Sequence, residues 1–258
     1  MHIDCAGRPA LLSARALWRL AAMLAAGALA ILWLGHYTDL DLRMADAAFD
    51  ARLGVFPLKH AWLTDTFNHV ILKWLLTLLA IAIVGLAAFD GLCPRGGLDA
   101  LGRLQMRIVA LSAILVPALT ASLKQHSSSH CPWDLLRYGG DQPYVRLFGG
   151  FPAHALPGQC LPAGHASSAL WLVAWSVFWL PARGAAARRV ALMATGFGAV
   201  VGYLQQLRGA HFMTHTLWSI WIACAIVLML IAVLQGRPWR TRLLGQRPRA
   251  LPAWMGQE

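Results

Sequence analysis

Acidic residues are scarce in this 258-residue chain, and their distribution is uneven. The sequence contains one glutamate, Glu258, and ten aspartates, all of which lie between Asp4 and Asp141. Residues 142–257 contain no carboxylate side chain. Charged residues make up only 13% of the chain, about half the share typical of a soluble domain. This composition excludes an ordinary soluble protein, and chemistry in the second half that needs an acid must take it from the first half.

The hydrophobic content points instead to an integral membrane protein. Hydrophobic residues make up 58% of the sequence, and the mean hydropathy is +0.55. The net charge of +11 would also suit a nucleic-acid partner. Most of the basic excess, however, lies between hydrophobic runs and at the C-terminus, so we expect a membrane bilayer and no nucleic acid as partner. No internal repeat or second soluble domain is evident, and residues 1–258 are predicted to form a single membrane domain.

Six apolar runs predict an all-α, polytopic membrane protein with six transmembrane helices. The first run has about 20 residues, longer than the 7–15 of a signal peptide, and is predicted to be a retained helix. Residues 36–71 hold five aspartates among aromatic residues. We predict an amphipathic periplasmic segment there, between helices 1 and 2. The predicted helices cover about residues 16–35, 72–92, 105–123, 166–180, 190–205 and 212–234.

The distribution of basic residues predicts the orientation of these helices. The N-terminus, the 93–107 loop, the 183–189 loop and the tail hold three, three, three and five arginines, fourteen in total, against eight basic residues in the opposite segments. By the positive-inside rule, both termini and the basic tail, 236–258, are cytoplasmic. Lys124, His165 and His211 then all fall on the periplasmic side of a bacterial inner (cytoplasmic) membrane.

Three polar segments at the predicted outer helix ends indicate a phosphate site. His165 and His211 each stand at the start of a predicted helix, where free backbone N–H groups and the helix dipole favour an anion. Gly164 allows the backbone to approach a ligand closely. Lys124 and Arg208 add positive charge. Two imidazoles beside a phosphate suit phosphoryl transfer, with one attacking phosphorus and the other protonating the leaving oxygen.

These segments resemble the three motifs of the type 2 phosphatidic acid phosphatase (PAP2) superfamily, over about residues 70–235. The motifs are usually written K-x6-R-P, P-S-G-H and S-R-x5-H-x3-D. The matching segments here are Lys124-x6-Cys131-Pro132, Pro162-Ala163-Gly164-His165 and Gly209-Ala210-His211 with His215 four residues later. The resemblance implies that His211 is the nucleophile and His165 the general acid. It also implies that Lys124 and the backbone N–H of Gly164 bind the phosphate, and it requires no metal and no cofactor.

The sequence departs from these motifs at four positions. Cys131 and Gln205 stand where the family has arginines, and Ala163 replaces a serine. His215 replaces the aspartate that orients the nucleophile, although its i,i+4 spacing from His211 still allows a contact. Several other residues are candidates to supply the missing groups in space. They are Asp46, Asp50 and Asp134 for the acid, and Arg137, Arg146 and Arg208 for the arginines.

The cysteines raise two further hypotheses. Cys131 and Cys160 fall in the long outer loop, where oxidation is permitted, and we expect them to form a disulfide; two free thiols are the alternative. His126, His130 and Cys131 could be metal ligands, but nothing completes a four-ligand site, and we predict no metal.

We therefore predict a membrane lipid phosphatase or phosphotransferase whose substrate is a lipid phosphate or diphosphate. The pattern leaves open which lipid it uses, whether water or a second lipid accepts the phosphoryl group, and the oligomeric state. The alternative is a catalytically impaired lipid-binding or accessory protein of the same fold, favoured by His215, Cys131 and Gln205. A transporter ranks last, because we find no ionisable residue near the centre of predicted helices two, four, five or six.

Overall fold

The computed structural model describes residues 10–94, 97–146, 149–150 and 156–236. The described part is helical, with two isolated β-bridges and no named strand. The predicted basic tail falls almost wholly on 237–258, outside the described residues. The α-helices are α1 Ala14–Tyr37, α2 Leu40–Ala48, α3 Lys73–Leu92, α4 Ala100–Gln125, α5 Gly164–Leu170, α6 Gly184–Leu207 and α7 Met213–Gly236; η1 Leu63–Leu72 is a π-helix, and η2 Pro132–Asp134, η3 Leu136–Tyr138 and η4 Trp171–Trp179 are 3₁₀-helices.

Five helices in the described part are long and apolar enough to cross a membrane: Ala14–Tyr37, Leu63–Leu92, Ala100–Gln125, Gly184–Leu207 and Met213–Gln235. They confirm the prediction of an all-helical membrane protein. The predicted helix at 166–180 consists instead of α5, with seven residues, followed by η4, with nine. Neither piece has the length of a membrane span on its own, so the structure supports five spans and leaves the sixth as a prediction.

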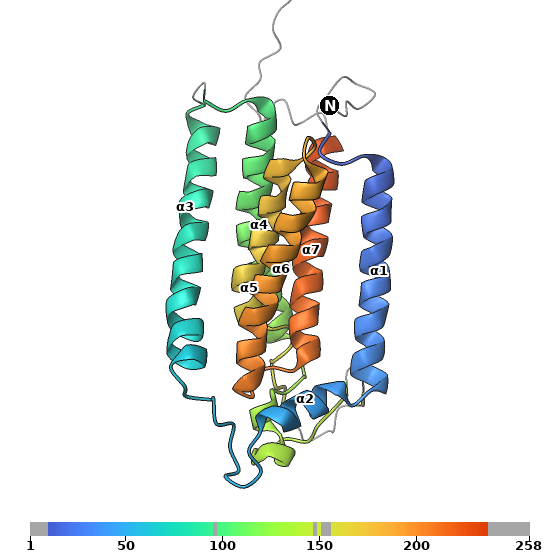
Figure 1. The fold of residues 1–258 in the computed structure, drawn as a ribbon, viewed down its shortest axis with the longest axis vertical. Helices are drawn as coiled ribbons and strands as arrows, with labels where there is room; N and C mark the ends of the chain where they lie inside the picture. Colours follow the sequence, from blue (N-terminus) through green and yellow to red (C-terminus); the bar gives the residue numbers. More distant parts are fainter. Residues whose placement is uncertain (1–9, 95–96, 147–148, 151–155, 237–258) are drawn as a thin grey trace, which may run out of the picture.

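The central part of the fold is formed by α4, α5, η4, α6 and α7, with α1 and α3 on opposite sides of this group (Figure 1). The largest buried cluster contains residues from α4, α5, η4 and α7, such as Val116, Leu170 and Trp171. In contrast, α1 and α3 expose large apolar side chains, including Trp18 and Trp74. Apolar exposure on this scale is unusual for a soluble monomer and is typical of a surface that faces lipid.

Two glycines allow α6 to pack closely against its neighbours. A Cβ atom on Gly198 would lie 2.3 Å from Cδ2 of Leu170, and one on Gly202 would lie 2.3 Å from Cγ2 of Thr216. Small residues at such positions allow close approach of helices where the hydrophobic effect contributes little to their association. These contacts fix α6 against α5 and α7, the helices that carry the second and third sequence motifs.

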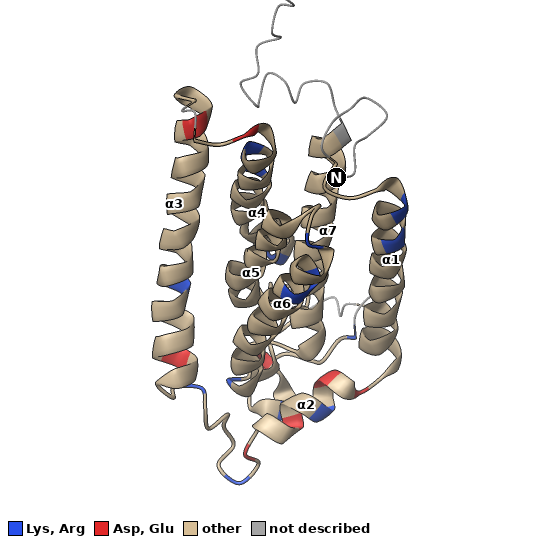
Figure 2. Ribbon diagram, turned by 45° about the horizontal axis from the view of Figure 1, so that its top comes forward, with Lys and Arg blue, Asp and Glu red and all other residues tan. Residues whose placement is uncertain are grey.

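Charged residues are concentrated toward the two ends of the bundle. At the end that holds the α3–α4 turn, Asp90 pairs with Arg103 at 3.3 Å and with Arg107 at 3.8 Å. At the other end, α2 carries charges of both signs, whereas most of α1 is uncharged (Figure 2). The end with α2 also holds the loop between α4 and α5, and therefore the candidate site.

Candidate active site

The three sequence motifs come together at one end of the bundle. Cys131 and Cys160 form a disulfide with a Cα–Cα distance of 5.4 Å, which joins the first motif to the segment before the second. The backbone N–H of Ala163 donates to the carbonyl of His215 at 3.1 Å and so joins the second motif to the third. The N–H of Trp133 donates to the carbonyl of Gly209 at 3.0 Å and so joins the first motif to the third.

His211 and His215 are in contact at the start of α7. Their Nδ1 atoms lie 3.5 Å apart, and the rings meet edge to face with a centroid distance of 5.7 Å. On its other side, Nε2 of His215 lies 3.1 Å from the hydroxyl of Ser129. The three side chains thus form a row in the order Ser129, His215, His211.

His211 is almost completely buried, with 3% of its surface exposed. This burial lowers the pKa of His211 well below its usual value of 6.5, and the neighbouring His215 and Lys124 act in the same direction. The imidazole is therefore neutral at physiological pH, which is the form that can act as a nucleophile. A sulfur of the disulfide, Sγ of Cys160, lies 3.5 Å from Nδ1 of His211.

His165 lies in a cluster of positive charge. Lys73, Lys124 and Arg208 all act electrostatically on its ring. The ammonium groups of Lys73 and Lys124 also repel one another, and neither forms an ion pair with any residue that the structure describes. The Nε2 atom of His165 is buried and has no hydrogen-bond partner in that part of the chain. Two uncompensated cations favour an anion here, and Nε2 of His165 can bind it as a donor when it carries a proton.

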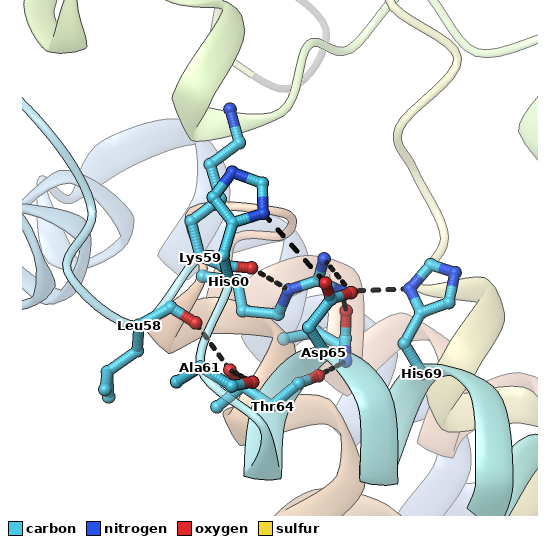
Figure 3. A network of polar contacts seen from close by, with 9 residues as sticks. Leu58, Lys59, His60, Ala61, Thr64, Asp65 and His69 are labelled. Atoms are coloured by element: carbon cyan, nitrogen blue, oxygen red, sulfur yellow. Dashed lines mark hydrogen bonds and ion pairs between the residues drawn. The ribbon is translucent and has the colours of Figure 1, made fainter.

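Arg208 is held by residues from the segment before α3. Its Nη2 donates to Asp65 at 2.7 Å and its Nε to the carbonyl of Lys59 at 2.9 Å, and its Nη1 lies 2.9 Å from both Nδ1 of His69 and Oε1 of Gln205. Figure 3 shows this network around Asp65 and His69. These contacts engage four of the five N–H groups of a guanidinium, so one has no partner among the described residues. Gln205, in the family arginine position, helps to position Arg208.

None of the three aspartates considered as a replacement acid contacts His211. Asp46 accepts from Arg137 and Tyr138, Asp50 accepts from backbone N–H groups of its own turn, and Asp134 accepts from the N–H of Cys131. Each of these carboxylates is engaged by other donors, and none of the three takes the place of the orienting aspartate beside His211 in the described structure.

Asp41 is instead the acid that reaches the third motif. From α2 it accepts hydrogen bonds from the backbone N–H and the hydroxyl of Thr214, the residue beside His215. The first turn of α7 has free backbone N–H groups, and Phe212, which precedes it, has no side-chain acceptor for them. Asp41 supplies an acceptor from α2 instead. Burial raises the pKa of Asp41, while the hydrogen bonds from Thr214 oppose that effect.

The arginines considered for the first motif are also engaged elsewhere. Arg137 pairs with Asp46 at 2.7 Å, and Arg146 pairs with Asp39 and donates to two carbonyls of the α1–α2 turn. The position of the family arginine is therefore taken by half of a disulfide, and no other arginine among the described residues replaces it there. Because both sulfurs are in that disulfide, the group Cys131, Cys160 and His211 offers no thiolate to a metal.

A cavity of about 460 Å³ reaches Ser129, the outer residue of this row, and neither His215 nor His211 is among its lining residues. Its walls include the apolar side chains of Leu123, Trp218 and Trp221, and its polar rim includes His126 and Ser129. The cavity thus combines apolar side chains with polar ones, of which Ser129 contacts His215, and its volume is within the range of small-molecule sites.

The sequence analysis did not identify four residues of this site: Asp41, His69, Lys73 and Ser129. One signal was available for two of them, because His69 and Lys73 are ionisable residues, four positions apart, at the beginning of a long apolar helix. Ser129 is one of three consecutive serines, and no pattern distinguishes it from the other two. Asp41 reaches the site through tertiary packing.

The fold and site define a helical membrane protein with a histidine-rich, positively charged site at one end of its bundle. The PAP2 superfamily profile matches residues 105–239, and the chain belongs to this superfamily. No curated protein and no solved structure matches the chain. Members of the superfamily are generally phosphatases, so membership indicates phosphatase-type activity on phosphate esters. The matched region contains Lys124, His165, His211 and His215, whereas Asp41, His69 and Lys73 lie before it.

Proposed function

We propose that this protein is a membrane lipid phosphatase or phosphotransferase that acts through a phosphohistidine on His211. The observation that carries the proposal is the neutral, buried His211 beside Lys124 and His165, in contact with a second histidine. Such an arrangement supplies a nucleophile, a proton donor and positive charge for the phosphate within one site.

The contacts of His215 support a defined tautomer for the nucleophile. Attack by Nε2 of His211 requires a lone pair on that atom and therefore a proton on Nδ1. That Nδ1–H then has two acceptors, the backbone carbonyl of Cys160 and Nδ1 of His215, and in this tautomer the proton of His215 lies on Nε2 and is donated to the hydroxyl of Ser129. His215 and the carbonyl of Cys160 thus do the orienting part of the aspartate's role but add no negative charge.

The reaction then proceeds in two displacements. The Nε2–P bond forms as the bond from phosphorus to the lipid oxygen breaks, and His165 gives its proton to that leaving oxygen. In the second step, His165 removes a proton from water or from a second lipid's hydroxyl, which attacks phosphorus and releases His211. The negative charge of the bound phosphate favours the protonated form of His165 that the first step needs.

Three groups hold the phosphate in this proposal. The ammonium of Lys124 is free to pair with it, and the remaining N–H of Arg208 faces it. A Cβ atom on Gly164 would meet no neighbouring segment within 4 Å in the part of the chain that the structure describes. Packing therefore does not require glycine at this position, whereas close approach of a phosphate to the backbone N–H does.

We further propose six membrane crossings, with both termini in the cytoplasm and the site at the periplasmic face of a bacterial inner membrane. The sixth crossing is α5 and η4 together. At 1.5 Å per α-helical residue and 2.0 Å per 3₁₀ residue, their seven and nine residues extend about 28 Å, close to the roughly 30 Å of a bilayer core. The α2 segment would then lie at the periplasmic surface.

The apolar walls of the 460 Å³ cavity support a lipid as substrate or acceptor. Phosphatidic acid, phosphatidylglycerol phosphate, undecaprenyl diphosphate and the phosphates of lipid A all fit the proposal. A second candidate function is that of a lipid-binding accessory protein without turnover. His215 in place of the orienting aspartate is the observation that favours it.

Phosphate release by the detergent-purified protein from these four lipids, measured beside His211→Ala, tests the proposal. Release from one lipid that is lost in the variant would establish the enzyme and identify its substrate. Equal release by the variant would exclude His211 as the nucleophile. If no lipid releases phosphate, the assay is repeated with donor and acceptor lipids together. Transfer then identifies a phosphotransferase, and its absence supports the accessory protein.

A further inference from the structure

The π-helix before α3 brings a third imidazole to the site. The ring of His69 lies against that of His165, with centroids 4.1 Å apart and planes tilted by 44°. His69 belongs to η1, outside the region that the family profile matches. Short π-helical segments are rare and are often found at functional sites.

The contact with Arg208 fixes the tautomer of His69. A guanidinium has only donors, so Nδ1 of His69, 2.9 Å from Nη1 of Arg208, must accept. A neutral imidazole that accepts at Nδ1 carries its proton on Nε2. Figure 3 shows the second ring nitrogen of His69 on the side of the ring away from this contact. His69 is therefore an Nε2–H donor, and no residue in the described part of the chain accepts from it.

Arg208 is itself held rigidly. Asp65 and the carbonyl of Lys59 accept from it on the side of η1, and Oε1 of Gln205 accepts on the side of α6. Its side chain is 7% exposed. A donor oriented by such a network loses little rotational freedom when it binds a ligand, so its contact costs less entropy than one from a flexible chain.

The surroundings of His69 identify the kind of ligand. The adjacent Nε2 of His165 is buried without a partner, and Lys73 and Lys124 act electrostatically on both imidazoles. The N–H donor of His69 and two uncompensated cations are complementary to a phosphate oxygen, as is Nε2 of His165 when it carries a proton.

We propose that His69 is a further phosphate-binding residue, which donates from Nε2–H to an oxygen of the phosphoryl group, with Arg208 and Asp65 as its positioning residues. This inference rests on the proposed function, since it concerns the same site. It extends that site to the helix before the matched region and makes Arg208 chiefly a support for His69.

Two substitutions separate a donor to phosphate from a structural partner of Arg208. The amide of His69→Gln can place an N–H donor near the position of Nε2. The carbonyl of His69→Asn can still accept from Arg208 near the position of Nδ1, but the donor to phosphate is lost. His60→Asn is the matched control, because His60 also lies beside Asp65, at 4.0 Å, yet its side chain is 81% exposed.

The experiment measures the affinity of the full-length protein in detergent for inorganic phosphate by calorimetry, together with kcat/KM for the lipid substrate and the thermal midpoint. We expect His69→Asn to lower phosphate affinity and kcat/KM by about tenfold to a hundredfold, as for a lost hydrogen bond to a charged group. We expect His69→Gln to recover most of this loss and His60→Asn to behave as wild type, all with unchanged thermal midpoints.

Several outcomes would overturn the assignment. Wild-type phosphate affinity in His69→Asn excludes a donated hydrogen bond, and equal losses in the Asn and Gln variants indicate a packing role for the ring. Wild-type protein that binds phosphate but has no turnover refutes only the proposed function, and the affinities still decide the role of His69. Wild-type protein that binds no phosphate overturns both proposals.

Discussion

Nδ1 of His215 lies 3.5 Å from Nδ1 of His211. The Nδ1 atom of His211 is the one that the carboxylate of an orienting aspartate would be expected to contact. A carboxylate at this place would fix the tautomer of the nucleophile and also stabilise the imidazolium-like charge that develops as it attacks. A neutral imidazole performs only the first of these tasks. The site is thus assembled for the chemistry but has weaker electrostatic support for the nucleophile.

His215→Asp is therefore expected to maintain the turnover rate or to raise it by up to about tenfold, because the carboxylate accepts from His211 and carries a charge. His215→Leu keeps the volume without an acceptor and should lower kcat by about a hundredfold or more. Steady-state kinetics on the same lipid measures both. A large loss in the Asp variant would show that the imidazole of His215 has a specific role that a carboxylate does not replace.

Ser129→Ala tests the outer end of the same row. Loss of the hydroxyl removes the partner of Nε2 of His215. His215 can then carry its proton on Nδ1, and this tautomer of His215 leaves His211 protonated at Nε2. We expect kcat to fall about threefold to tenfold, the value of one neutral hydrogen bond, with KM unchanged. Ser128→Ala is the control, since Ser128 is adjacent to Ser129, whereas in the described structure the hydroxyl that contacts His215 is that of Ser129. Nitrogen-15 spectra of labelled histidine would reveal the change of tautomer directly.

The sequence was sufficient to predict the membrane class, and it singled out three motifs that the fold brings together. The spacing of residues within each motif follows local helix geometry, so a short sequence pattern is enough to detect it. The contacts of Asp41 with Thr214 and of Arg208 with Asp65 link residues separated by 173 and 143 positions. No local pattern encodes such pairs. The short 3₁₀-helix η4 also escaped prediction, because a buried apolar run looks the same in either helical form.

The low pKa of His211 predicts a specific dependence of stability on pH. The folded protein keeps this imidazole neutral, while the unfolded chain binds a proton near pH 6.5. The unfolded state therefore binds more protons below that pH, and the stability contributed by neutral His211 decreases as the pH falls, by up to about 1.4 kcal/mol per unit. Thermal midpoints in detergent at pH 7.5 and 5.5 should differ less for His211→Asn than for wild type. An equal difference would mean that the pKa of His211 is the same in the folded and the unfolded protein.

The disulfide is expected to contribute both stability and activity. The bond between Cys131 and Cys160 spans 29 positions, and chain-entropy arguments give about 3–4 kcal/mol for a loop of this size. The double variant Cys131→Ala, Cys160→Ala should have a lower thermal midpoint. Its turnover should also fall, because the bond joins the first two motifs beside His211. Cys93→Ala is the control, since Cys93 is a free, exposed cysteine. Equal midpoints for the double variant and wild type would contradict this expectation.

Alanine substitution at two glycines of the site should have different effects, a loss of stability at Gly209 and a higher KM at Gly164. Gly209 has φ +73°, and an added Cβ would lie 2.5 Å from the ring of Phe56. Gly209→Ala is therefore expected to destabilise the fold by about 1–3 kcal/mol or more. At Gly164 an added Cβ would meet no atom of another described segment within 4 Å, so Gly164→Ala should keep the thermal midpoint and raise KM about tenfold or more by obstructing the phosphate. Thermal midpoints and steady-state kinetics of both variants test these two expectations. Normal kinetics in Gly164→Ala would mean that the phosphate does not approach this backbone N–H, and the phosphate would then be held by side chains alone.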